Sequence, residues 1–145
     1  MRLDRRSLER AYLATHYVVF AGGAPLILRI GERNRELDRL LRRHGRRDWA
    51  FLTAWNPRSR LLPHWRNAHR QRRLARLFPQ ALDGAGIGVD PDWPAEDSLC
   101  VLGVAAGRAR RTGRLFGQYA ILAGTRGGVA RLLWCDAEGC GGLIP

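Results

Sequence analysis

The sequence predicts a single α+β domain over residues 1–145, organised around a ferredoxin-like βαββαβ unit at about residues 49–123. Two patterns support this prediction. Short runs rich in valine, leucine and isoleucine alternate with longer stretches in which apolar residues recur every three or four positions, which is typical of strands alternating with helices. The chain also has the length of one ordinary domain, and no linker or internal repeat divides it.

The opening of the chain is expected to form a ββα arrangement ahead of this unit. After a short helix at residues 7–14, two strands are joined by "AGGAP", whose glycines and proline favour a hairpin-like turn. The next helix carries Leu37, Leu40 and Leu41 on one stripe and ends at Gly45, a residue type favoured just past a helix C-terminus. The expected strands are residues 16–20 and 26–30, and the expected helix is residues 32–45.

The main unit begins with the strand "WAFLT" and is extended by a C-terminal strand across the turn "TRGG". The acidic segment 83–97 holds five of the 13 acidic residues and is expected to be a loop, and residues 135–145 are expected to be a loose tail. The expected elements are a strand at 49–53, a helix at 63–78, strands at 85–89 and 98–104, a helix at 105–117, and strands at 119–124 and 129–134.

The charge of the chain favours anionic partners or ligands. The net charge is +12, and all 25 basic residues are arginine. An excess of positive charge attracts phosphates and carboxylates. The absence of lysine excludes a phosphate-loop lysine and Schiff-base chemistry.

No membrane partner is predicted, and the chain is expected to be cytoplasmic. No apolar run approaches the roughly 18 residues of a spanning helix. The cysteines Cys100, Cys135 and Cys140 are odd in number and lack the spacing of a disulfide framework, which suits a reducing compartment.

A metal site is not predicted, and the sequence identifies no cofactor. The acids of the segment 83–97 are of the type that bind magnesium or calcium, but their spacing lacks an EF-hand pattern. The two prolines of "DPDWP" fit an ordinary rigid loop. The histidines and cysteines have no arrangement that completes four zinc ligands.

Polar residues follow the strand 49–53 and are expected to meet others at one end of the sheet. In the predicted topology this strand lies antiparallel between the third and fourth strands of the unit, so its C-terminal end lies beside their starts. The helix after Pro63 begins at the same end. The residues expected to converge there are Thr53, Asn56, Ser59, Asn67, Arg70, Glu96, Arg114 and Gln118.

The helix at 63–78 supports this expectation independently. Leu74 and Phe78 set its buried direction, and Asn67 and Gln71 fall within roughly 40° of that direction, with Arg70 near its edge. Buried amides and guanidinium groups need partners. This stripe therefore indicates either a satisfied internal network or a ligand.

The words "WAFLTAWNPRS", "WPAEDS" and "GRLFGQYAIL", together with Asn67 and Arg70, resemble the bacterial domain of unknown function family 3293. The resemblance extends over most of the chain, and "TAWNP" with "FGQ" is its most specific combination. It implies a small bacterial protein of unassigned activity, so it supports the polar cluster without naming its chemistry.

The leading hypothesis is a polar pocket that binds an anionic small molecule or a nucleotide-like ligand. Arg70 and Arg114 would engage the anion, because a guanidinium forms two parallel hydrogen bonds with phosphate or carboxylate. Glu96 is the best candidate for a general base if chemistry occurs. Trp55 and Trp93 are placed to stack on a base or sugar.

Two alternatives remain open at this stage. In the first alternative, the chain is a nucleic-acid-binding module that uses the exterior arginines of residues 66–76, with those of residues 42–47 as an added contact. Alternatively, the polar residues form a closed internal network that fixes the fold, and "NP" with its neighbours only turns the chain.

Overall fold

A computed structural model describes residues 4–136 of the chain and has a mixed α+β fold, which confirms the predicted class. The described part contains four α-helices, one short 3-10 helix (η1) and seven strands. The helices are α1 (Arg5–Ala14), α2 (Arg35–Arg43), η1 (Pro57–Ser59), α3 (His64–Leu77) and α4 (Ala106–Leu115). The strands are β1 (His16–Val19), β2 (Leu26–Leu28), β3 (Asp48–Leu52), β4 (Leu82–Ile87), β5 (Glu96–Leu102), β6 (Ala120–Thr125) and β7 (Arg131–Trp134).

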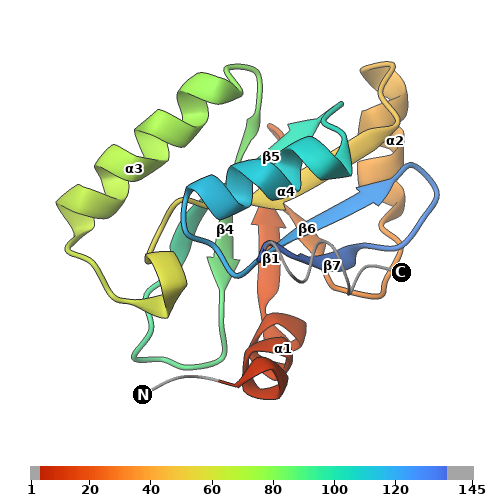
Figure 1. Ribbon diagram of the computed structural model, residues 1–145. Helices are drawn as coiled ribbons and strands as arrows, with labels where there is room; N and C mark the ends of the chain where they lie inside the picture. Colours follow the sequence, from red (N-terminus) through yellow and green to blue (C-terminus); the bar gives the residue numbers. More distant parts are fainter. Residues whose placement is uncertain (1–3, 137–145) are drawn as a thin grey trace.

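All seven strands form one antiparallel sheet in the order β2-β1-β4-β5-β3-β6-β7 (Figure 1). The four strands of the predicted βαββαβ unit occupy the centre, with β3 between β5 and β6 as the pattern predicts. The opening strands extend the sheet because β1 pairs with β4, and β7 extends it beyond β6. The C-terminal end of β3 therefore lies beside the starts of β5 and β6.

The sheet curls until its two edges approach each other. An isolated bridge joins Ile30, just after β2, to Ala130, just before β7, and a second joins Arg33 to Val129. The right-handed twist of strands favours such coiling when a sheet has many of them. The curl gives the sheet a concave face that α2 fills at one end.

Each face of the sheet has its own apolar core because side chains alternate along a strand. Ala50 and Leu52 of β3 face α3 and α4 and join a core that includes Leu74 and Phe116. Trp49 and Phe51 face the other way and join a core with the leucines of α2. In Figure 1, α4 crosses in front of the sheet and α1 lies at its lower end.

Seven of the 15 residues of the acidic segment 83–97 belong to strands, so the segment is only in part a loop. Residues 83–87 belong to β4 and residues 96–97 to β5, so only residues 88–95 connect them. The expected strand at 85–89 began three residues late, because the glycines of "DGAG" weaken the strand signal there. Gly84 is needed where it stands: a Cβ there would lie 2.7 Å from the Val18 carbonyl oxygen and 2.9 Å from the Phe51 ring.

The end of the described chain is tied to the fold. Cys135, the first residue of the expected tail, is buried, and its backbone N–H donates to the Tyr119 carbonyl at 2.8 Å. Asp136 forms an ion pair with Arg5 at 2.9 Å. Residues 137–145 of the expected tail lie outside the described residues.

Candidate functional site

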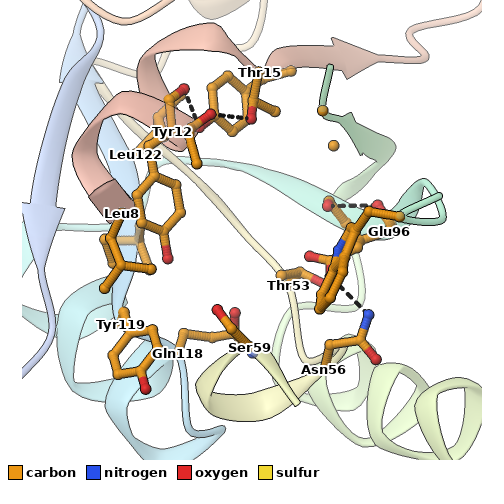
Figure 2. Close-up of a pocket in the computed structure, with 18 of the residues that line it drawn as sticks. Leu8, Tyr12, Thr15, Thr53, Asn56, Ser59, Glu96, Gln118, Tyr119 and Leu122 are labelled. Atoms are coloured by element: carbon orange, nitrogen blue, oxygen red, sulfur yellow. Dashed lines mark hydrogen bonds between the residues drawn. The ribbon is translucent and has the colours of Figure 1, made fainter. Parts of the chain in front are cut away.

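A cavity of about 400 Å³ opens on the concave face of the sheet, beside α1 and at the end opposite α2. Figure 2 shows Leu8, Tyr12 and Tyr119 on one side of it and Thr53, Glu96 and Asn56 on the other. Its volume lies within the range of small-molecule sites, roughly 300–1,000 Å³. The lining residues that matter below are Leu8, Tyr12, Tyr17, Phe51, Thr53, Asn56, Arg58, Ser59, Trp93, Glu96, Gln118 and Tyr119.

One side of the cavity is aromatic and apolar. Tyr17 and Phe51 pack edge to face, with ring centroids 5.4 Å apart, and both belong to the concave core. The Tyr17 hydroxyl donates to the Tyr12 carbonyl of α1 at 2.8 Å, which holds this helix over the sheet end. Because α1 is anchored in this way, Leu8 and Tyr12 complete the apolar wall.

The opposite side is centred on the carboxylate of Glu96, the first residue of β5. Its Oε2 accepts hydrogen bonds from Asn56 Nδ2 at 2.8 Å and from the Trp93 indole at 3.0 Å. Among the residues that the structure describes, none donates a hydrogen bond to Oε1. Burial raises the pKa of Glu96, and the hydrogen bonds from Asn56 and Trp93 oppose that rise only in part.

Asn56 is held in place by a reciprocal pair with Asn67 of α3. The Asn67 side chain accepts from the Asn56 backbone N–H at 2.9 Å and donates to Asn56 Oδ1 at 2.8 Å. Asn56 Oδ1 also accepts from the Leu62 backbone N–H at 2.9 Å. Both asparagines are almost fully buried, with 3% and 1% of their surface exposed. Asn56 thus connects the buried side chain of Asn67 on α3 to the Glu96 carboxylate in the cavity.

The loop at the cavity contains strained backbone. Asn56, Arg58 and Ser59 have φ values of 45°, 53° and 57°, and no other non-glycine residue in the described chain has positive φ. All three line the cavity. Such conformations cost about 1–3 kcal/mol each and persist where the surroundings enforce them, often at functional sites.

Gly117 allows the loop to approach the "FGQ" turn. Its φ is +73°, and a Cβ there would lie 2.8 Å from Pro57 Cβ. The Arg58 backbone N–H donates to the Gly117 carbonyl at 2.8 Å, and Gln118 Nε2 donates to the Trp55 carbonyl at 3.0 Å. The two sequence words of the family resemblance are therefore in direct contact.

The Arg70 side chain reaches the same loop from α3 and does not line the cavity. Its Nε donates to the Ala54 carbonyl at 2.8 Å, and a terminal nitrogen donates to the Phe116 carbonyl. Burial, followed by the charges of Arg73 and Arg66, lowers the pKa of Arg70. Its guanidinium joins the two segments that flank the site.

The structure separates the eight predicted site residues into two groups. Those that line the cavity are Thr53, Asn56, Ser59, Glu96 and Gln118. Asn67 and Arg70 lie behind the loop in the internal network just described, and Arg114 is exposed on α4 outside the cavity lining. The two arginines expected to engage an anion in the pocket are thus not among its lining residues.

Several lining residues were missed by sequence reasoning. Tyr12 and Leu8 come from α1, whose docking against the sheet end leaves no local signal. Arg58 belongs to the segment "TAWNPRS", and its position next to the predicted site residue Ser59 could have identified it. Of the two tryptophans proposed for stacking, Trp93 lines the cavity, whereas Trp55 is buried against His64 at 5.5 Å between ring centroids.

Neither a metal cluster nor a membrane-spanning helix is found in the described part of the chain. Within residues 4–136, no group of three or more His, Cys, Asp or Glu side chains is placed to hold a metal ion. Each described helix is too short or too polar to cross a bilayer. Asp90 uses Oδ1 to accept from the Asp92 backbone N–H at 2.9 Å, an ordinary turn contact.

Comparison with known proteins gives a family match. Residues 52–121 match the family described as Protein of unknown function (DUF3293). No curated protein and no solved structure matches the chain. The matched segment contains the strained loop, Glu96 and Gln118, whereas α1 and β1 lie outside it. The resemblance inferred from the sequence is confirmed, and residues 52–121 of this chain resemble the DUF3293 family of proteins of unknown function.

Proposed function

We propose that the cavity binds a nucleotide-like small molecule, with a flat ring that carries N–H donors and an attached anionic group. The observation that supports this most directly is Glu96, a largely buried carboxylate whose Oε1 has no donor in the described residues and which faces an aromatic wall. Because Glu96 lines the cavity, this oxygen is available to a ligand that supplies a donor.

The ring of such a ligand fits between the two walls. Tyr12, Tyr17 and Phe51 provide aromatic surface, and nucleobases stack on aromatic side chains. Amino and imino N–H groups on the ring edge would donate to Glu96, as base amino groups donate to carboxylates elsewhere. A purely anionic ligand without donors is disfavoured beside this carboxylate.

The anionic group is assigned to the side of the cavity where Arg58 lies. The Arg58 side chain is exposed, and within residues 4–136 it forms no ion pair. A guanidinium matches phosphate or carboxylate geometry. The positive φ of Arg58 places this residue in a conformation that an unstrained loop would not adopt. Arg58 thereby takes the role that the sequence suggested for Arg70 and Arg114.

Glu96→Gln is expected to abolish stabilisation by nucleotides. The single amide oxygen is expected to stay with the two donors, Asn56 and Trp93, so the NH2 group takes the place of Oε1 and opposes the N–H groups of the ligand. Wild type with a nucleoside monophosphate at one hundred times Kd should gain about 2.7 kcal/mol. This corresponds to a rise in Tm of roughly 5–10 °C. Differential scanning fluorimetry with the four ribonucleoside monophosphates, their nucleosides and a sugar phosphate measures this shift.

The matched control is Glu9→Gln, which removes the same charge from an exposed position of α1 that does not line the cavity. It should keep the wild-type shift. The proposal fails if no nucleotide or nucleoside raises Tm, or if Glu96→Gln responds as wild type does. Arg58→Gln should weaken the response to nucleotides more than the response to nucleosides, because only nucleotides carry the phosphate.

The pH dependence of stability provides a further prediction for Glu96. Because its pKa in the folded protein is raised, the ionised carboxylate is less favourable in the folded state than in the unfolded state. This cost is absent below the unperturbed pKa, about 4.3, and grows as pH rises through the folded value. Ligand-free Glu96→Gln should therefore gain stability relative to wild type as pH rises. Urea unfolding at about pH 4 and about pH 8 tests this, and a gain that shrinks with pH would contradict it.

A further inference from the structure

The outer face of α3 carries an aromatic and basic stripe that the cavity does not use. Trp65, His69, Arg72 and Arg76 are all exposed, and Trp65 has 71% of its surface accessible. At about 100° per residue these four positions fall within roughly 60° of arc. The stripe is about 16 Å long, since a helix rises about 1.5 Å per residue.

Positive charge surrounds this stripe, and the two helices on this face of the sheet carry no acidic residue of their own. Helix α3 contains five arginines and α4 contains four, and neither helix contains an Asp or Glu. The ion pairs within residues 4–136 are Arg5–Asp136 and Arg33–Asp38, and neither involves these helices. Like charges three or four positions apart destabilise a helix. The exposed arginines on the two helices are Arg66, Arg72, Arg73, Arg76, Arg108, Arg111 and Arg114.

The two helices pack on the same face of the sheet, so both carry their exposed arginines on that side of the molecule. Arg108 of α4 lies 4.8 Å from the centre of the Phe78 ring, which directly follows α3. Arg70 of α3 lies 5.9 Å from the centre of the Phe116 ring, which directly follows α4. The arginines of α2 differ, because Glu36 and Asp38 accompany them on the same helix.

We propose that this face binds single-stranded nucleic acid, with a base stacked on Trp65 and phosphates on the arginines of α3. An exposed indole offers a π-face to any base, and arginines on both sides attract the backbone. At the roughly 3.4 Å per nucleotide of a stacked strand, the stripe matches at most about five nucleotides, and fewer in a more extended strand. In a duplex the faces of the bases are stacked on one another and cannot stack on Trp65, so the exposed indole favours a single strand. This inference is independent of the cavity proposal.

The test is fluorescence anisotropy with a labelled single-stranded RNA of about twelve nucleotides and the matching DNA. For Arg72→Gln/Arg73→Gln/Arg76→Gln, the slope of log affinity against log salt should fall by about two, since each phosphate contact contributes about 0.7 in single strands. Trp65→Ala should weaken binding by roughly tenfold at constant salt and leave that slope unchanged, because stacking is not ionic. All four side chains are exposed, so these variants are expected to fold.

The matched control is Arg39→Gln/Arg42→Gln/Arg43→Gln, which removes the same charge from exposed positions of α2 on the other side of the sheet. It should change affinity less than twofold. The inference is overturned if this control weakens binding as much as the α3 variant, or if Trp65→Ala binds like wild type. It is also overturned if phosphatidylserine vesicles bind and the oligonucleotides do not.

The two proposals fail separately. Glu96→Gln should bind the oligonucleotide with wild-type affinity, because the carboxylate lines the cavity and the stripe lies on α3. Loss of oligonucleotide binding in Glu96→Gln alone would place the strand in the cavity and overturn this inference while leaving the cavity proposal standing. Loss in the α3 variants alone supports the inference whatever the nucleotide screen gives.

Discussion

Asn56→Ala is expected to destabilise the protein by about 3–4 kcal/mol. The substitution removes the acceptor of the Asn67 amide and of the Leu62 backbone N–H, and the donor to Glu96. Unpaired buried polar groups cost about 1–3 kcal/mol each. Alanine is also unfavourable at the φ of 45° found here, by roughly 1–2 kcal/mol. Equilibrium urea unfolding monitored by tryptophan fluorescence measures the loss.

Asn56→Gly separates the two causes. Glycine loses the same hydrogen bonds but adopts positive φ without strain, so it should be about 1 kcal/mol more stable than Asn56→Ala. Equal stability of the two variants would show that the left-handed conformation contributes nothing. A wild-type unfolding curve for Asn56→Ala would remove the basis for treating Asn56 as the link between α3 and the cavity.

Arg70→Met is expected to cost about 3 kcal/mol and to lower Tm by roughly 10 °C. Methionine keeps the unbranched apolar stem but leaves the Ala54 carbonyl without the Arg70 donor and weakens the pairing of the Phe116 carbonyl. Gln118 reaches the Phe116 carbonyl only at 3.4 Å, so it compensates poorly. Thermal unfolding followed by circular dichroism measures the change.

Arg73→Met is the control for Arg70→Met because it removes the same charge from the exposed side of the same helix. Its effect should stay within about 0.5 kcal/mol. A loss in Arg73→Met equal to that in Arg70→Met would mean that charge, and not the two carbonyl contacts, determines the result. If both variants unfold like wild type, Arg70 does not fasten the loop to the "FGQ" turn.

The sequence predicted the central part of the fold because its elements have strong local signals. Continuous apolar runs marked β3 and β5, and the stripe of Leu74 and Phe78 marked α3. The antiparallel neighbours of β3 follow from the order of these elements, since short connections leave few ways to form one sheet. The strand β4 was placed three residues late because glycines interrupt its pattern.

The polar side of the cavity could also be predicted from the sequence, for a related reason. Thr53, Asn56, Ser59, Glu96 and Gln118 stand at strand ends that the predicted topology brings to one edge. The inward position of Asn67 was visible from helical periodicity, and its burial agrees with that expectation. These inferences depend only on spacing along the chain and on the order of the elements.

Tertiary structure alone decided which polar groups face the cavity and which form hydrogen bonds within the protein. Arg70 and Glu96 are both polar residues near one sheet end. Arg70 pairs with two carbonyls, whereas one oxygen of Glu96 has no donor within residues 4–136. The docking of α1, which supplies the apolar wall, depends on contacts such as that of Tyr17 with Tyr12. Periodicity gives the direction of a side chain relative to its own element, but its partners come from elements distant in sequence, so only the packed chain determines them.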